Sequence, residues 1–417
     1  MRFRVHPAKV FILPIIKLRF TIDLRAYRRL TKFKNLSAPL GARTRFARLS
    51  GVFSAARPPK KRISKDFRKG ERCVRHVNIP VFIPHLGCPN NCVFCDQRKI
   101  SGCVSFDESC VEKEIEQALS TPSPDDDVEI AFFGGSFTGI DRDLMLRLLE
   151  ISDKFVASGK VKRVRCSTRP DYIDGEILQI LRSHHVETVE LGIQSMSDSV
   201  LSASKRGHTA QTAREACKAV KLGGFDLVGQ MMIGLPGSTS ADEIETAEEI
   251  CRLGADGARV YPTVVFAETE LAHMTVDGRY LPLSLDEAIE RTASVLDVFD
   301  RAGVPVIRVG LCAGENLSSP ESVVGGANHP ALGELAMGEL TFRRICEKAD
   351  EALAAMDGNG KTMTVYVPLG ATSRAVGQKK RNILRLNEKY CKNHAINRIK
   401  ILENSSIIGY NIIIDIN

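Results

Sequence analysis

Three cysteines, Cys88, Cys92 and Cys95, lie within eight residues and constrain this chain more than any other feature. The apolar run 78–84 before them predicts a strand, and a Gly-Cys-Pro sequence then turns the chain. The thiols are therefore expected on a loop leaving a buried strand, where a rigid scaffold can hold a metal site. Three thiolates serve three irons of a [4Fe–4S] cluster, which usually has four cysteine ligands. The missing fourth ligand leaves one iron open for a substrate, like the open position of catalytic zinc sites.

The same spacing allows a second interpretation. His85 with the three cysteines could form a Cys3His zinc site, because zinc takes four nitrogen or sulfur ligands in a tetrahedron. Disulfides are less favoured, because the twelve cysteines are scattered along the chain and no secretory signal is evident. The spacing alone leaves the iron–sulfur cluster and the zinc site open.

Residues 1–75 form a basic extension with 22 lysines and arginines against three acids, so the remaining chain is net acidic. Such a segment can be a nucleic-acid-binding arm or an organelle transit peptide. A third interpretation is a disordered or artefactual extension, because the segment is polar and strongly self-repelling. No apolar run in the chain reaches the length of a membrane span, and we expect a cytoplasmic protein without a membrane partner.

Strands and helices are predicted to alternate from residue 76 to residue 311. The strands are short, near-continuous apolar runs, which is typical of parallel strands covered on both faces. The alternation predicts an α/β fold with six to seven βα units, a partial TIM-type (β/α)6 barrel over residues 76–311. Strands are expected at 78–84, 128–133, 161–168, 187–193, 226–233, 257–261 and 304–311. Such a barrel carries its active site at the carboxyl ends of the strands.

The spacing of Cys88, Cys92 and Cys95 resembles the cysteine motif of the radical S-adenosylmethionine superfamily. The resemblance implies that the open iron binds the amino and carboxylate groups of S-adenosylmethionine. An electron from the reduced [4Fe–4S] cluster then breaks the sulfur–C5′ bond, and the 5′-deoxyadenosyl radical takes a hydrogen atom from a substrate. It also implies an external electron donor of flavodoxin or ferredoxin type. Phe94 matches the aromatic residue that packs near the adenine in that superfamily.

Two strand ends extend the resemblance. Gly134-Gly135 is similar to the superfamily's glycine-rich element, which binds the amino group of S-adenosylmethionine; the alternative is a tight turn between strand and helix. Ser167 takes the place where some relatives have a glutamate on the cofactor. It begins a Ser-Thr-Arg-Pro-Asp stretch that resembles an element of the elongator catalytic subunit. Arg169 within this stretch could instead form a structural ion pair.

Gln194 and Arg206 resemble a pair in oxygen-independent coproporphyrinogen oxidase. In that family the glutamine binds ribose hydroxyls and the arginine binds the cofactor carboxylate, for which the guanidinium fork is suited. The alternative is that both residues only line a polar rim. Gln230 aligns with a polar ribose-contacting position, and Tyr261 lies in a Tyr-Pro-Thr element like that of the elongator subunit. Tyr261 is therefore expected to face substrate or cofactor.

Residues 312–417 predict a small α+β extension. We expect a strand at 362–367, a basic helix within 370–390 and a closing hairpin within 400–417. The basic residues of the expected helix form either a solvated face or a nucleic-acid-binding patch. They are Arg374, Lys379, Lys380, Arg381 and Arg385, accompanied by Gln378. Cys312, at the start of this region, is either a structural thiol or a substrate contact.

Three functions remain open from the sequence. The first is a radical S-adenosylmethionine enzyme that acts on RNA, with tRNA as the expected partner, because the elongator catalytic subunit modifies wobble uridine in tRNA. The second is the same chemistry on a small molecule or a tetrapyrrole. The third is a non-enzymatic, metal-stabilised binding protein that uses the barrel as a platform. No acetyl-CoA motif of the elongator acetyltransferase domain is found in the sequence, and no catalytic residue can be named from it.

Overall fold

The computed structural model describes residues 74–84, 86–88, 92–97, 106–311, 322–355, 361–392 and 396–417. Residues 1–73, His85 and Cys312 lie outside the described residues, so the interpretations given for them stay predictions. Within the described ranges, no helix combines the length and the apolar character needed to cross a membrane.

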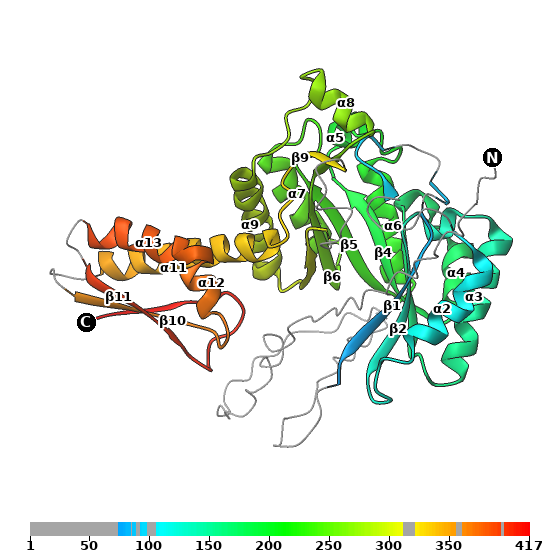
Figure 1. The fold of residues 1–417 in the computed structure, drawn as a ribbon, viewed down its shortest axis with the longest axis horizontal. Coiled ribbons are helices and arrows are strands. Elements are labelled where there is room, and N and C mark those ends of the chain that lie inside the picture. Colours follow the sequence, from blue (N-terminus) through cyan, green and yellow to red (C-terminus); the bar gives the residue numbers. More distant parts are fainter. Residues whose placement is uncertain are drawn as a thin grey trace, which may run out of the picture.

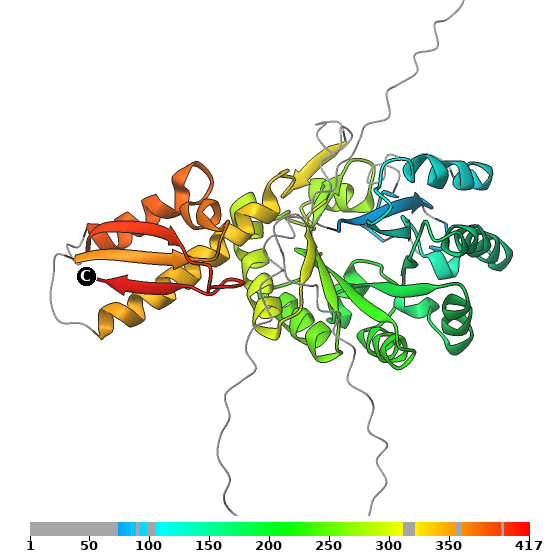
Figure 2. The same ribbon diagram turned by 90° about the horizontal axis from the view of Figure 1, so that it is seen from below.

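Seven parallel strands form one curled sheet in the order β1-β2-β3-β4-β5-β6-β8 (Figures 1 and 2). This confirms the partial barrel, with β8 as a seventh strand after six βα units. β1 and β8 are the two ends of the strand order and do not pair with each other. The strands are β1 (His76–Phe82), β2 (Asp127–Phe133), β3 (Arg163–Thr168), β4 (Val186–Gln194), β5 (Asp226–Ile233), β6 (Gly257–Pro262) and β8 (Val306–Val309).

Helices cover the outer side of this sheet (Figure 2). Side chains just before the helices fix where they begin: Thr239 and Ser284 form capping boxes, which satisfy N–H groups of the first turn. Gly303 ends the last of them in the left-handed conformation. The helices are α2 (Glu108–Ala118), α3 (Arg142–Ala157), α4 (Gly175–Ser183), α5 (Asp198–Ala203), α6 (Ala210–Leu222), α7 (Ser240–Arg252) and α9 (Leu285–Ala302).

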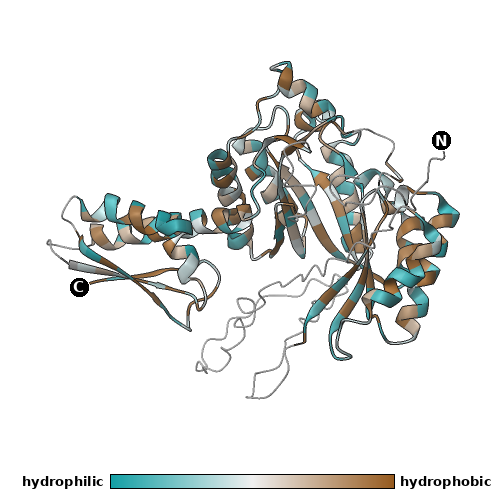
Figure 3. Ribbon diagram, in the orientation of Figure 1, coloured by the Kyte–Doolittle hydropathy of each residue, from teal (hydrophilic) through white to brown (hydrophobic). Residues whose placement is uncertain are grey.

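The main hydrophobic core lies between the sheet and these helices. Figure 3 shows hydrophobic residues along the strands and on parts of each surrounding helix. Ile130, Leu148, Leu181 and Val220 are fully buried there, from one strand and three helices. Short elements connect the strands at their carboxyl ends. They are η2 (Phe137–Gly139), η3 (Pro170–Tyr172), α8 (Glu270–Val276) and the antiparallel pair β7 (Val264–Phe266) and β9 (Val323–Gly326).

The inner face of the curled sheet is charged, which the near-continuous apolar reading of the strands did not predict. Glu129 is 0% exposed and accepts hydrogen bonds from Arg163 Nε at 3.2 Å and Arg165 Nε at 2.8 Å. Glu190 is 1% exposed and accepts from Arg165 Nη1 at 2.7 Å and Arg259 Nη2 at 2.9 Å. Acids on β2 and β4 thus pair with arginines on β3 and β6, and each of these buried carboxylates has an opposite charge beside it.

A small α+β unit follows the barrel, as expected. A 23-residue helix, α11, packs on α9 at its beginning and on a second sheet at its end (Figure 1). That sheet has the order β11-β10-β12, and the helices cover one of its faces. The elements are α11 (Leu332–Ala354), β10 (Lys361–Val367), α12 (Thr372–Val376), η4 (Gln378–Lys380), α13 (Arg381–Leu386), the π-helical η5 (Asn387–Cys391), β11 (Ile396–Glu403) and β12 (Ile413–Ile416).

Two expectations for this unit were wrong. The closing hairpin expected within 400–417 is not formed, because β10 lies between β11 and β12 and pairs with both. Its residues Met363, Val365 and Val367 are fully buried, as expected for the central strand of the sheet. The basic helix expected within 370–390 is interrupted between α12 and α13 by residues with positive φ.

Candidate active site at the carboxyl ends of the barrel strands

The cysteine loop is fixed to the end of β2 by close backbone contacts. Ile83 N–H donates to the last carbonyl of β2 at 2.7 Å, and Ser136 N–H donates to the Leu86 carbonyl at 3.2 Å. A Cβ on Gly134 would lie 3.1 Å from Ile83 N, and one on Gly135 would overlap the Leu86 carbonyl oxygen. Both positions therefore need glycine, because the backbone of the cysteine loop lies too close for a Cβ. Their contact with S-adenosylmethionine stays a prediction.

The cysteine thiols are partly or fully buried, and the positive charges of Arg206 and Arg169 affect the pKa of Cys88. Cys92 is buried, and Cys88 and Cys95 are partly buried. Burial raises the pKa of the Cys88 thiol, which the positive charges of Arg206 and Arg169 lower in part. Burial also raises the pKa of Cys95 to about 12. Both thiols are therefore protonated at neutral pH, and a metal must release their protons to bind.

The described side chains contain no set of three or more His, Cys, Asp or Glu groups that could hold a metal ion together. The cysteines of an iron–sulfur cluster bind different irons and need not converge on one point. This geometry is therefore compatible with a cluster.

Phe94 packs toward α8 rather than standing apart on the loop. Its neighbour Val93 is held from both sides, because its N–H donates to Ser204 O at 3.2 Å and its carbonyl accepts from Leu271 N at 2.8 Å. Phe94 lies against the small hydrophobic cluster that includes Val93, Leu271 and Tyr280. The predicted position beside the adenine is not tested by this packing.

Gln194 and Arg206 meet beside the cysteine loop. Arg206 Nη2 donates to Gly192 O at 2.7 Å, and Arg206 Nη1 lies 3.5 Å from Cys92 Sγ. Gln194 is buried with φ of 68°, a conformation that residues with a Cβ seldom adopt. A Cβ on Gly192 would lie 2.7 Å from Arg206 Nη2 and 3.1 Å from Gln194 Nε2. The glycine at the end of β4 thus makes room for both side chains.

Arg169 lies buried beside the site, where the sequence had left a structural ion pair as one interpretation. It is 2% exposed, and it donates to both carboxylate oxygens of Asp171, at 2.9 and 2.7 Å. The ion pair considered for it is therefore present, but Arg169 Nη1 has no hydrogen-bond partner. Its backbone is fixed by Ser136, whose hydroxyl accepts from Arg169 N at 3.2 Å and lies 2.8 Å from Thr168 Oγ1.

His208 was also missed, although it follows Arg206 by two residues. Its Nε2 lies 3.3 Å from Ile193 O, and its Nδ1 has no hydrogen-bond partner. Burial, and next the positive charge of Arg206, lowers the pKa of His208 to about 4. The ring is therefore neutral at neutral pH. With Nε2–H toward the carbonyl, Nδ1 is left as an acceptor.

The remaining predicted residues line the inner face of the sheet. Ser167 is partly buried and pairs with Glu190 in the β3–β4 ladder, and its hydroxyl makes no side-chain hydrogen bond within the described part of the chain. Gln230 is partly buried between Gly192 and Arg259 in the register. Tyr261 accepts from Arg259 Nη1 at 3.4 Å and so belongs to the charged inner face.

Several buried polar atoms at the ends of β3 and β4 and in the segments that follow them lack a partner in the described part of the chain, and four of them concern the site. These four are Arg169 Nη1, Gln194 Oε1, Arg206 Nε and His208 Nδ1. Buried polar groups are nearly always hydrogen-bonded, so this concentration indicates that a polar ligand completes them. Two cationic donors suit a carboxylate, and the two acceptors suit hydroxyl or amino groups. The residues present therefore fit S-adenosylmethionine next to the cysteine loop.

Comparisons with known families agree with this geometry. A sequence model of the radical SAM superfamily matches residues 82–250, and a model of the Radical_SAM C-terminal domain matches residues 255–341. The two matches together cover more than half of the chain.

Individual relatives match parts of the chain. An uncharacterized protein of Methanocaldococcus jannaschii is 29% identical over 232 residues, covering 52% of this chain and 70% of that protein. A tRNA uridine(34) acetyltransferase of the same organism is 31% identical over 197 residues, covering 42% of this chain and only 36% of the relative. The solved structure of the archaeal Methanocaldococcus infernus Elp3 with an N-terminal deletion has a TM-score of 0.51 at 21% identity. It covers 65% of this chain and 64% of that one, and it shows a shared fold.

Radical SAM enzymes use a [4Fe–4S] cluster and S-adenosylmethionine. The match therefore decides between the cluster and a zinc site in favour of the cluster, and a non-enzymatic binding protein is not supported. The chain is an enzyme that belongs to the radical S-adenosylmethionine superfamily, with these two cofactors.

Proposed function

We propose that this enzyme cleaves S-adenosylmethionine reductively and uses the radical to modify an RNA, with tRNA as the substrate class. The observation that carries the radical step is the gathering of unpartnered polar atoms beside Cys92. The RNA half is supported by the relatives, which include a tRNA uridine(34) acetyltransferase. This chain spans 36% of that relative, so its complete reaction is not carried over.

In this proposal Cys88, Cys92 and Cys95 each bind one iron of the cluster. When bound, the cluster supplies the electron that breaks the sulfur–carbon bond. Arg206 places a positive charge 3.5 Å from Cys92 Sγ. A positive charge beside a cluster sulfur favours the reduced form, because reduction adds negative charge. Burial of Cys92 keeps water from that sulfur.

We assign the cofactor-binding roles to the buried polar atoms that have no hydrogen-bond partner in the described part of the chain. Arg206 Nε and Arg169 Nη1 are the two cationic donors, and we assign Arg206 to the carboxylate of S-adenosylmethionine. Gln194 and Gln230 would hold the ribose hydroxyls, and His208 Nδ1 would accept from a hydroxyl or the adenine amino group. The remaining proposed contacts are Gly134 and Gly135 with the amino group, Phe94 with the adenine, and Ser167 at the cofactor.

The substrate is expected to enter over the charged inner face of the sheet. Arg259 and Tyr261 lie on this face, beyond Gln230. The alternative is a small molecule or a tetrapyrrole with the same radical chemistry. An external donor of flavodoxin or ferredoxin type and a cytoplasmic location belong to the same proposal.

The radical half can be tested by spectroscopy before any substrate is known. Protein reconstituted anaerobically with iron and sulfide is reduced with dithionite, and its electron paramagnetic resonance spectrum is recorded with and without S-adenosylmethionine. We expect a cluster signal that shifts when the cofactor is added. Cys88→Ala should lose the signal, whereas Cys110→Ala, an exposed cysteine on α2, should keep it. A signal that S-adenosylmethionine leaves unchanged would contradict the proposal.

The RNA half needs a separate experiment. The reconstituted protein is crosslinked to total cellular RNA, and the captured RNA is sequenced. We expect tRNA to be enriched over its share of the input. Capture in proportion to the input, or no capture, would favour the small-molecule alternative.

A further inference from the structure

Two successive lysines between α12 and α13 adopt the left-handed backbone conformation. Lys379 has φ of 51° and Lys380 has φ of 64°. Single non-glycine residues of this kind occur elsewhere, but this is the one successive pair among the residues that the structure describes. The conformation is costly for a residue with a Cβ and persists only where the surroundings enforce it.

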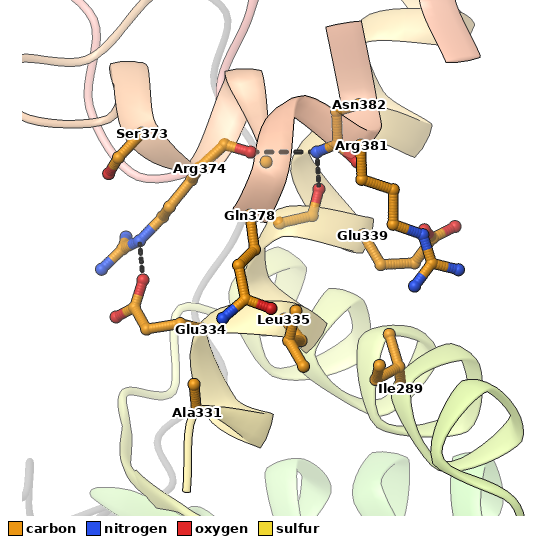
Figure 4. A pocket seen from close by; sticks show the side chains of 12 residues that line it. Ile289, Ala331, Glu334, Leu335, Glu339, Ser373, Arg374, Gln378, Arg381 and Asn382 are labelled. Carbon is orange, nitrogen blue, oxygen red and sulfur yellow. Dashed lines mark hydrogen bonds and ion pairs between the residues drawn. The ribbon is translucent and has the colours of Figure 1, made fainter. Parts of the chain in front are cut away.

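A buried amide enforces this turn. Asn382 is 3% exposed, and its Nδ2 donates to Gly338 O on α11 at 2.8 Å and to Arg374 O on α12 at 3.0 Å (Figure 4). A Cβ on Gly377 would lie 2.8 Å from Asn382 Cγ and 2.9 Å from its backbone nitrogen. The segment is therefore locked onto α11 with both lysine side chains exposed.

The charges around the turn are unevenly neutralised. Residues 372–392 contain seven lysines and arginines and one acid. Lys379 and Lys380 have no acidic partner among the described residues, whereas the other five basic side chains do. Those pairs are Arg374 with Glu334, Arg381 with Asp286, Arg385 with Glu339, Lys389 with Asp350 and Lys392 with Glu388. The excess positive charge is therefore concentrated on the strained turn.

A cavity of about 160 Å³ lies directly beside the turn. Ser373, Arg374, Gln378 and Arg381 line it from the side of the turn, and Ile289 of α9 lines it from the barrel (Figure 4). Glutamates of α11 also line the cavity, but each is paired with an arginine. The cavity offers amide, hydroxyl and guanidinium donors, which suit phosphate oxygens.

We propose that the Lys379–Lys380 turn and this cavity form a docking site for the phosphate backbone of RNA, separate from the radical site. The inference rests on the proposed RNA substrate. Lysines bind phosphate as point charges, and a turn held in a strained conformation with unpaired charges is explained by a ligand that uses them. The site would hold the RNA while another part of the molecule enters the barrel.

The placement of the turn suits this role. The elements that follow the barrel strands, α5, α8 and β9, lie at the top in Figure 1, and α13 lies on the upper side of its own sheet. The open face of that sheet points downward in Figure 1 and toward the viewer in Figure 2. An RNA docked on the helices of the small unit would therefore lie on the same side as the barrel mouth.

The sheet supplies a matched control. Arg398 and Lys400 on β11 are exposed and, among the described residues, have no acidic partner. They alternate with Ile399 and Ile401, which pack toward the helices, so they lie on the opposite, open face. Lys379→Gln with Lys380→Gln and Arg398→Gln with Lys400→Gln therefore remove the same charge from opposite faces. Both double variants are made in the full chain, so that residues 1–73 contribute equally to each.

Binding of a fluorescein-labelled tRNA transcript is measured over a range of salt concentrations. The Lys379/Lys380 variant should bind about tenfold more weakly at low salt, with the log–log salt slope reduced by about two, because two phosphate contacts are lost. The Arg398/Lys400 variant should stay within about twofold of the wild type. Equal weakening in both variants would overturn the site, because it would show only the effect of net charge.

Two further measurements distinguish a folding defect from a lost contact, and RNA from other polyanions. Lys379→Gly with Lys380→Gly removes the charges and relieves the left-handed conformation, so it should bind RNA weakly while its melting temperature stays the same or rises. Unweakened binding by this variant would contradict the proposal. Double-stranded DNA of equal length is used as a second competitor. If it competes as well as unlabelled tRNA, the turn binds polyanions in general and is not an RNA site.

These tests can contradict the proposed radical reaction and the proposed docking site independently of each other. Cys88→Ala should bind the labelled tRNA like the wild type, and the Lys379/Lys380 variant should form 5′-deoxyadenosine normally without substrate. If tRNA binds at the turn but no 5′-deoxyadenosine forms, the docking site stands and the proposed reaction fails. If 5′-deoxyadenosine forms but the turn does not contribute to tRNA binding, the docking site fails alone.

Discussion

Arg206 and Cys92, 114 residues apart in the sequence, meet with Arg206 Nη1 3.5 Å from Cys92 Sγ. The loop after β4 thereby touches the loop after β1 across the mouth of the barrel. Because Arg206 Nη2 also donates to Gly192 O, the guanidinium is fixed and its Nε remains open. One side chain thus links the cysteine loop with the predicted cofactor pocket.

Replacing Arg206 should separate cofactor binding from cluster binding. In Arg206→Ala we expect S-adenosylmethionine to bind about 10- to 100-fold more weakly, because a charge-assisted hydrogen bond is lost, while the iron content stays unchanged. Arg214→Ala, which removes a half-exposed arginine paired with Glu249 on the outer side, is the control and should do neither. Isothermal titration and iron analysis measure the two quantities. Equal loss of cofactor and iron would place Arg206 in the fold rather than the site.

Gly135→Ala should displace the cysteine loop. The added Cβ would overlap Leu86 O and lie 2.9 Å from Ile83 O, and neither backbone atom can move without breaking the contacts that hold the loop. We expect a lower melting temperature and incomplete cluster incorporation. Gly175→Ala is the matched control, because nothing lies within 4 Å of its Cβ at the start of α4. It should be neutral or stabilising, and a normal cluster content in Gly135→Ala would refute the assigned contact.

Glu190→Gln should destabilise the barrel through its charged interior. Glu190 is buried and accepts from Arg165 and Arg259, so neutralising it leaves buried guanidinium groups without a full counter-charge. We expect a loss of about 3 kcal/mol in the free energy of unfolding, as for other broken buried pairs. Glu347→Gln, an exposed partner of Arg301 at 3.7 Å, should change it by less than about 0.5 kcal/mol. Similar values for both variants from urea unfolding would contradict the structural role of the inner network.

His208 should contribute to the pH dependence of stability. Burial, aided by the charge of Arg206, lowers the pKa of His208 from 6.5 to about 4. Between these two pKa values the unfolded chain binds a proton that the folded chain does not. The free energy of unfolding therefore rises with pH in this range, and the increase is complete above pH 6.5. The shift corresponds to about 3 kcal/mol. His208→Gln should flatten this part of the profile, and an unchanged melting-temperature slope between about pH 4.5 and 7 would show that His208 does not cause it.

The barrel was predictable because its signals are local. The apolar runs and the glycines after them mark each strand and its end, so the cysteine loop, Gln194 and Arg206 could be assigned to one sheet edge from the sequence. The burial of Arg169 could not be predicted, because it depends on contacts with other strand ends, such as that of its N–H with Ser136 after β2. The charged inner face was missed for a similar reason, since Arg163 and Arg165 find Glu129 and Glu190 only when β2, β3 and β4 align.

The small unit was predicted less well. Periodicity indicated strands within 400–417, but it does not determine pairing, and β11 and β12 are joined through β10. The broken basic helix was unpredictable, because lysines rarely adopt positive φ and the cause is the distant contact of Asn382 with Gly338. The division of the chain after residue 75 and after residue 311 stays a prediction.

The formation of 5′-deoxyadenosine tests most directly whether this enzyme cleaves S-adenosylmethionine reductively. Full-length protein, reconstituted anaerobically and reduced with dithionite, is incubated with S-adenosylmethionine, and the product is quantified by chromatography alongside iron and zinc. We expect about four irons per chain and steady product formation in the wild type and in Cys110→Ala, with neither in Cys88→Ala. One zinc and no iron, or undiminished product in Cys88→Ala, would contradict the proposed reaction.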